Sequence, residues 1–332
     1  MDYENFKEMV QDRIKSCLPE DYGNARVDVK RVYKVNQVKD SLVIIPEGKN
    51  ISLPNIYISN LYEGYKKCGS FEMVMRAVSD SIQRHGSLIQ EEVPELDKDS
   101  IKDNAVMCLV NTAQNMEMLQ NVPHRPFHDL SVIYRFIASQ GSGGISSAII
   151  TNRIMEEAGL APDKLFQYAA ENTKRLFPVR VLPIQDVLSE LLTGKEEDYG
   201  FAMEMLKQER TPEESIWVIT NSAGINGAAS VLYEENLHKL AEMTGTGLYI
   251  LPSSVHEVLA VPTDMGSPEE LAEMVYETNM SSVPLEERLS NNVYHYDGEI
   301  RKMSMVTGIN TRSIGGEKTF PDTIKNNSRQ KR

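Results

Sequence analysis

The chain has 332 residues, of which 41% are hydrophobic and 25% charged, and its formal net charge is −13. This composition excludes a mainly disordered chain, and the length suggests about two domains at roughly 150 residues each. The acidic start, Met1–Phe6, lacks the basic and then apolar order of a signal peptide, and no run of about 18 apolar residues occurs. We therefore expect a cytoplasmic protein that does not enter a membrane.

Charge is unevenly distributed along the chain. Residues 307–332 carry six Lys or Arg side chains against two carboxylates, a balance of +4, which leaves −17 for residues 1–306. Because such a body repels phosphates, nucleic-acid binding by it is disfavoured. The segment 307–332 has few apolar residues to pack, and we predict a disordered basic tail, with an anion-binding arm as the alternative.

Residues 1–90 are predicted to form a first region. Phe6, Val10 and Ile14 share one stripe of an amphipathic helix that ends before Pro19. A three-stranded meander over 25–35, 41–46 and 51–59 follows, and then two helices, one over 60–68 and one capped by Ser70. The acidic stretch 90–103 suggests a domain boundary.

Residues 104–306 are predicted to contain three units in which a hairpin is followed by a helix. The first has strands over 130–138 and 145–150 and a helix over 152–158. The second has strands over 216–220 and 228–233 and a helix over 234–243, and the third has strands over 248–251 and 255–261 and a helix from Ser267. Because hairpins join antiparallel strands, the predicted fold class is α+β with mostly antiparallel sheets covered by helices.

Histidines and neighbouring carboxylates are the first candidates for chemistry. His124, His128 and Asp129 lie within six residues, and His256 with Glu257 opens a later strand. If the fold joined these segments, two imidazoles and a carboxylate could hold a metal and leave a position for water. Pro126 prevents the helical spacing that such sites use, so we favour structural or partner-contacting histidines and assign no metal and no cofactor.

Two further patterns have plain structural interpretations. The loop 141–144 is rich in glycine but lacks the Lys-Ser/Thr ending of a P-loop, and it lies between two strands, so a hairpin loop is the favoured interpretation. Ser253, Ser254 and His256 are close in sequence, but no G-x-S-x-G elbow occurs in the chain. Hydroxyls that bond the local backbone of a turn are favoured over a nucleophile and base.

Four sequence segments together resemble the domain of unknown function 5688 family, a family of bacterial proteins common in gut Firmicutes. The resemblance extends nearly to Asp297 and rests on residues 54–62, 123–130, 172–178 and 251–258. It implies a bacterial cytoplasmic protein, and it implies no activity, cofactor or catalytic residue.

Two functions are compatible with these observations. The first is a protein-binding or interaction module without catalytic activity, in which loops or a groove contact a protein partner. The alternative is a hydrolase, with or without a metal, that uses His128, Asp129, His256 and Glu257. We favour the module because the sequence contains no complete catalytic constellation, and we name no catalytic residue beyond these four candidates.

Overall fold

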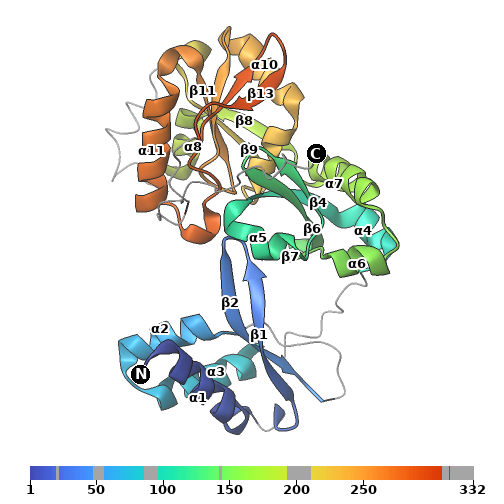
Figure 1. Ribbon diagram of the computed structural model, residues 1–332, viewed down its shortest axis with the longest axis vertical. Helices are drawn as coiled ribbons and strands as arrows, with labels where there is room; N and C mark the ends of the chain where they lie inside the picture. The colour runs from blue at the N-terminus through green and yellow to red at the C-terminus, as the bar shows by residue number, and fades with distance from the viewer. Residues whose placement is uncertain are drawn as a thin grey trace, which may run out of the picture. The chain divides into compact units, whose positions relative to one another are not determined.

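The computed structural model describes residues 1–19, 22–47, 56–85, 96–141, 144–192, 211–308 and 314. Two compact units contain them, unit 1 over Met1–Ser100 and unit 2 over Ile101–Arg332. The ribbon in Figure 1 shows both units. Residues 51–55 of the third predicted strand, residues 90–95 of the acidic stretch and all of the tail except 307, 308 and 314 lie outside the described residues.

Unit 1 combines a small antiparallel sheet with helices. Its elements are α1 (Tyr3–Arg13), the 3₁₀ helix η1 (Ile14–Cys17), β1 (Arg26–Lys34), β2 (Gln37–Ile45), β3 (Ile56–Tyr57), α2 (Ile58–Cys68) and α3 (Phe71–His85). The strand order is β1-β2-β3 with antiparallel pairing, as predicted for the meander. Figure 1 shows α1, α2 and α3 gathered beside the sheet.

Local signals account for the helix ends in unit 1. The Asp2 carboxylate accepts a hydrogen bond from the backbone N–H of Asn5 at 2.9 Å, which caps α1. Gly69 ends α2 with φ +71°, and the Ser70 hydroxyl accepts from the N–H of Met73 at the start of α3. The apolar faces of these helices and of the hairpin β1–β2 then form one core around the fully buried Phe6.

Unit 2 contains two antiparallel sheets. The smaller sheet has the order β4-β6-β5, with β7 also paired to β6, and the larger has the order β13-β12-β10-β11-β9-β8. The strands are β4 (Ala105–Asn111), β5 (His124–Phe127), β6 (Leu130–Gly141), β7 (Gly144–Ile149), β8 (Val179–Pro183), β9 (Trp217–Asn221), β10 (Leu248–Leu251), β11 (Val258–Pro262), β12 (Tyr294–Asp297) and β13 (Lys302–Met305). The α+β class is thereby confirmed.

Helices cover both sheets of unit 2. The α-helices are α4 (Lys98–Asn104), α5 (Met116–Leu119), α6 (Asn152–Glu157), α7 (Pro162–Leu176), α8 (Ile184–Leu192), α10 (Glu234–Thr244) and α11 (Pro268–Ser281). Helix α7 lies against β4, where the Thr173 hydroxyl accepts from the Met107 N–H at 2.8 Å. Helix α11 begins with the predicted capping box of Ser267 and Glu270, and its Leu271 and Val275 pack on the larger sheet.

The structure corrects one predicted hairpin. Residues 228–233 were expected to form a strand beside 216–220, but Gly227–Leu232 is a 3₁₀ helix, η6. Strand β9 already pairs with β8 on one side and β11 on the other, so its edges are filled by strands distant in sequence. The hairpins β6–β7 and β10–β11 form as predicted, and β5, β8, β12 and β13 are strands that the sequence patterns did not indicate.

Helix lengths bear on membrane insertion. Within the part of the chain that the structure describes, no helix has both the length and the apolar character needed to cross a bilayer.

Candidate functional site

His128 and Asp129 form the tight turn between β5 and β6. Phe127 pairs with Leu130 directly across this turn, so two residues reverse the chain. His128 has φ +56°, in the left-handed region, which sets the direction in which the following Asp129 leaves the turn. The first pair of predicted site residues therefore lies at the end of the smaller sheet.

The Asp129 carboxylate accepts three hydrogen bonds from the segment that leads into β12. Its donors are the Ser290 hydroxyl at 2.7 Å, the Asn292 amide at 2.8 Å and the Tyr294 hydroxyl. Tyr294 is fully buried, and this burial together with the Asp129 charge raises the pKa of its hydroxyl well above the usual range. Asp129 therefore links the smaller sheet to Tyr294 of the larger sheet and to Ser290 and Asn292, which precede it.

His128 lies against the same tyrosine. Its imidazole stacks on the Tyr294 ring with the centroids 4.9 Å apart and the planes at 25°. Partial burial lowers the pKa of His128, and the nearby Asp129 charge opposes that shift without cancelling it. The folded protein therefore takes up a proton on His128 at a lower pH than the unfolded chain does.

The lowered pKa of His128 predicts a pH dependence of stability. The unfolded chain protonates His128 near its ordinary pKa of about 6.5, while the folded protein protonates it at a lower pH, so the free energy of unfolding falls as pH drops below about 6.5. We expect the ring-proton NMR signals of His128 to titrate below pH 6.5. The variant His128→Asn, which tolerates the left-handed backbone, should lose less stability between about pH 7 and pH 5 than the native chain. A titration midpoint at or above 6.5 contradicts this assignment.

His256 and Glu257 lie in the turn before β11. The backbone N–H of His256 donates to the Ser254 hydroxyl at 3.0 Å, and its ring Nδ1 accepts from the Asn226 N–H at 3.3 Å. The other ring nitrogen, Nε2, lies 3.6 Å from Glu287 Oε1. Ser254 is thus engaged by the local backbone, as the turn interpretation predicts, and Glu257 is half-buried beside it.

The two pairs of candidates contact different parts of one segment. Asp129 contacts residues 290–294, whereas His256 contacts Glu287. Among the described residues no group of three or more His, Cys, Asp or Glu side chains is arranged to hold a metal ion. His124 lies apart on β5, with its Nδ1 3.0 Å from the Val122 carbonyl oxygen. No contact between described residues joins His128 to His256.

The partners of Asp129 were not predicted from the sequence. Ser290, Asn291 and Asn292 are all buried, although they form a polar run. Asn279 on α11 is also fully buried and donates to Ser290 O and Asn291 Oδ1 at 3.0 and 2.7 Å. The available signal was this run of polar residues directly before the apolar Val293, because polar groups inside a protein need partners.

A second group of polar side chains lines an open pocket of about 440 Å³ in unit 2. The pocket lies between the C-terminal half of α10, the residues before β10 and the turn that joins β12 to β13. Its polar lining comes mainly from His238, Glu242, His295, Asp297 and Glu299, and the other lining residues are the small Ala241, Gly245, Thr246, Gly247 and Gly298. None of these ten described residues is a lysine or an arginine.

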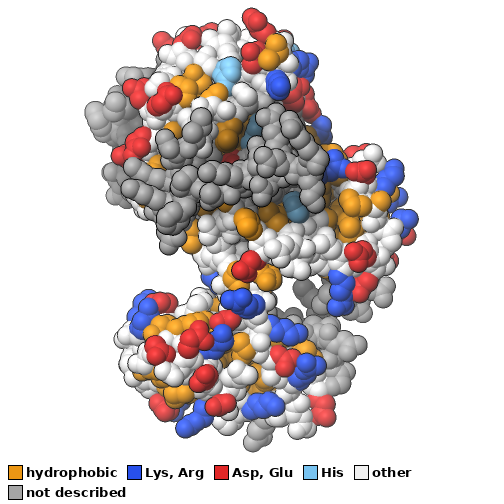
Figure 2. Space-filling model, in the orientation of Figure 1, with side chains coloured by type: hydrophobic (Ala, Val, Ile, Leu, Met, Phe, Trp, Pro, Cys, Tyr) orange, Lys and Arg blue, Asp and Glu red, His pale blue; other side chains and the backbone are white. Residues whose placement is uncertain are grey.

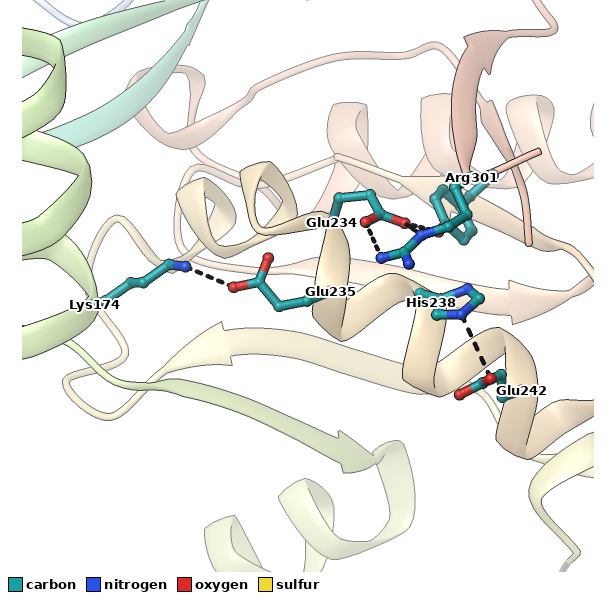
Figure 3. Close-up of polar contacts among 7 residues, drawn as sticks. Lys174, Glu234, Glu235, His238, Glu242 and Arg301 are labelled. Atoms are coloured by element: carbon teal, nitrogen blue, oxygen red, sulfur yellow. Dashed lines mark hydrogen bonds and ion pairs between the residues drawn. The ribbon is translucent and has the colours of Figure 1, made fainter. Parts of the chain in front are cut away.

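Contacts around the pocket orient its histidines and carboxylates. His238 Nε2 lies 3.4 Å from Glu242 Oε1, one helical turn along α10, as Figure 3 shows. The Nδ1 atom of His238 is buried and has no hydrogen-bond partner among the described residues. Gly247 leaves room for His295, because a Cβ atom there would lie 2.7 Å from His295 Nε2.

Arg301, in the turn between β12 and β13, already has a carboxylate partner. Arg301 donates to both carboxylate oxygens of Glu234 at 2.9 and 2.5 Å, and Figure 3 shows this pair at the start of α10. Arg301 and the Tyr296 hydroxyl together lower the pKa of Glu234 to about 2. Lys174 pairs with Glu235 at 2.6 Å in the same way. The carboxylates that remain without a cationic partner among the described residues include Glu299 and Asp297 of the pocket.

Comparison with known proteins matches the chain to one family. A family model described as "Family of unknown function (DUF5688)" matches residues 3–298, which confirms the resemblance drawn from the sequence. No curated protein and no solved structure matches the chain.

Proposed function

This chain belongs to the DUF5688 family, and from that premise we propose that it is a protein-binding module whose pocket in unit 2 takes a lysine or arginine side chain of its partner. The observation that carries the proposal is the composition of the pocket lining. Three carboxylates and two imidazoles surround about 440 Å³ of open space, and no described lining residue carries a permanent positive charge.

The charge of the lining favours a cationic group. Glu242 and Glu299 both line the pocket and can accept hydrogen bonds from an ammonium or guanidinium group, and such charge-assisted bonds are stronger than neutral ones. The chain carries a net charge of −13, which adds a long-range attraction for a basic partner. Both effects disfavour an anionic ligand at this place.

The small residues of the lining favour a side chain with an aliphatic stem. Ala241, Gly245 and Gly298 place little bulk in the pocket and leave its floor open. Lysine and arginine carry three or four methylene groups behind the charged end, so their stems can cover this floor while the charge reaches the carboxylates. The volume is within the range of about 300–1,000 Å³ that is typical of ligand pockets.

The residues proposed for the hydrolase alternative have other roles among the described contacts. Asp129 accepts three hydrogen bonds, and His256 Nδ1 accepts a backbone N–H. A general base needs a free acceptor within reach of the proton that it abstracts. These contacts support the binding module over the hydrolase.

The proposal is tested by titrating the protein with capped amino acids and following the imidazole NMR signals of His238 and His295. Capped lysine and arginine should shift these signals, whereas capped norleucine, which has a similar stem without the charge, should not. The double variant Glu242→Gln with Glu299→Gln should weaken the binding of capped lysine by roughly threefold to tenfold.

Glu156→Gln is the matched control for this variant. Glu156 is exposed on α6, outside the pocket, so its replacement removes a carboxylate and should leave the affinity for capped lysine unchanged. Equal binding of lysine and norleucine, or equal weakening by the control, contradicts the proposal.

A further inference from the structure

Unit 1 contains a groove of about 280 Å³ whose chemistry is opposite to that of the pocket in unit 2. It lies between the end of α1, the 3₁₀ helix η1 and the helix α3. Its floor includes Phe71 and Met75, which are 7% and 2% exposed, and its rim includes Arg13 and Arg76. From these residues we propose that the groove binds a small amphipathic carboxylate, in which an apolar chain lies on the floor and the carboxylate contacts the two arginines.

The two arginines have guanidinium groups available for a ligand. Both side chains are exposed, and among the described residues neither forms an ion pair. Arg13 stands in the last turn of α1, where its charge suits the helix dipole, but that interaction uses none of its N–H donors. Arginine presents a planar set of donors that matches a carboxylate, so two of them on one rim favour an anion.

The local charge of unit 1 permits such a ligand. Unit 1, over residues 1–100, contains 14 Lys or Arg and 17 Asp or Glu side chains, a balance of −3, whereas the whole chain carries −13. Figure 2 shows basic and acidic side chains interspersed with hydrophobic ones over the face of unit 1 that it draws. An anion that approaches this unit therefore meets a smaller excess of negative charge than one that approaches unit 2, whose balance is −10.

The apolar floor of the groove favours a ligand that has an apolar chain as well as a negative charge. Phe71 and Met75 follow one another on the same face of α3, one turn apart, and Cys17 lines the groove opposite them. A methionine adapts its shape to a flexible apolar chain, which suits a straight alkyl group. The Ser79 hydroxyl at the rim adds one further donor for the carboxylate.

Glu72 is the one acidic residue in the described lining of the groove. Its replacement is expected to change the affinity for a carboxylate in the direction opposite to the arginine replacements. It is exposed in the first turn of α3, and no ion pair with Arg76 forms among the described residues. Its charge repels a carboxylate in the groove. Replacing Glu72 with glutamine should therefore strengthen binding, while replacing either arginine should weaken it.

The test uses the full chain labelled at the methionine methyl groups, with octanoate as the probe and octanamide and octylamine as its neutral and cationic counterparts. Met75 is identified among the sixteen methionines by the signal that Met75→Leu removes, a substitution that conserves volume. We expect octanoate to shift the Met75 signal with a dissociation constant on the order of 1 mM, and the other two compounds to bind several times more weakly.

Three variants complete the test. Arg13→Gln and Arg76→Gln should each weaken octanoate binding roughly threefold to fivefold, and Glu72→Gln should strengthen it about twofold. Arg31→Gln is the matched control, because Arg31 is an exposed arginine on β1 outside the groove. Circular dichroism spectra identical to those of the native chain establish that each variant is folded. The proposal is overturned if octanoate leaves the Met75 signal unchanged at 10-fold this concentration, if octanamide binds equally well, or if the arginine variants bind octanoate as the native chain does.

Discussion

Replacing Gly227 with alanine should lower the free energy of unfolding of unit 2 by about 3 kcal/mol. A Cβ atom at this position would lie 2.3 Å from the His256 carbonyl oxygen, 2.3 Å from Thr220 Oγ1 and 2.9 Å from the Asn221 backbone nitrogen. Two of these atoms belong to the backbone, and the third is held by a 2.8 Å hydrogen bond from Thr220 Oγ1 to His256 O. Because none of these atoms can move alone, β9, η6 and the turn before β11 must move apart to make room for the added methyl group. This movement disrupts their packing.

The measurement is urea unfolding followed by the fluorescence of Trp217. This residue is the single tryptophan of the chain and is 7% exposed in β9, the strand that precedes the clash, so its emission reports on unit 2. The matched control is Gly141→Ala, since a Cβ there meets nothing within 4 Å and the backbone is not left-handed. A Gly227 variant as stable as the Gly141 variant contradicts the close packing described for η6.

Replacing Asp129 with alanine should lower the free energy of unfolding by a similar amount, about 3 kcal/mol. The substitution leaves the hydroxyls of Ser290 and Tyr294 and the amide of Asn292 without their shared acceptor. Loss of the acceptor costs most free energy at the Tyr294 hydroxyl, because this side chain is fully buried and has little access to water. The link between the smaller sheet and the segment before β12 is then lost.

A second substitution separates a structural role of Asp129 from a catalytic one. If the loss arises from stranded donors, Tyr294→Phe should cost less in the Asp129→Ala background than in the native chain, because it removes a hydroxyl that has no acceptor left. Asp264→Ala, an exposed aspartate in the 3₁₀ helix before α11, serves as the control and should change stability by less than about 0.5 kcal/mol. Additive effects of the two substitutions would show that Asp129 and Tyr294 are not coupled.

Two sites of opposite charge give the chain two separable binding tests. The pocket in unit 2 is lined by Glu242 and Glu299 and is proposed for a cation, whereas the groove in unit 1 has Arg13 and Arg76 at its rim and is proposed for an anion. Substitutions in one set should leave the ligand of the other unaffected, since the residues belong to different compact units. The two proposals can therefore be tested independently of each other.

The candidate histidines show which parts of a site can be predicted from sequence patterns and which cannot. Segments 123–130 and 252–257 were named from the sequence as the places of the candidate histidines and carboxylates. The turn with Ser254 and His256 was predicted, whereas strand β5 within 123–130 was not. Their partners were not predicted, because Asp129 and Ser290 are 161 residues apart and no periodic pattern relates them. Likewise, the pocket joins His238 on α10 to His295 on β12, which only the pairing of β10 with β12 brings together.

The sequence by itself determined the local elements of this protein. These elements include the amphipathic stripe of α1, the capping box at Ser267, the left-handed Gly69 and the hairpins β6–β7 and β10–β11, and each depends on residues no more than 14 positions apart. Together they determine the α+β class. The tertiary structure alone decided the order of the six-stranded sheet, the 3₁₀ helix over Gly227–Leu232 where a strand over 228–233 was predicted, and which carboxylates line the open pocket. The physical reason is that strand order and buried hydrogen bonds depend on which segments, far apart in the sequence, pack against one another and exclude water. The spacing of residues within one segment contains no information about that packing.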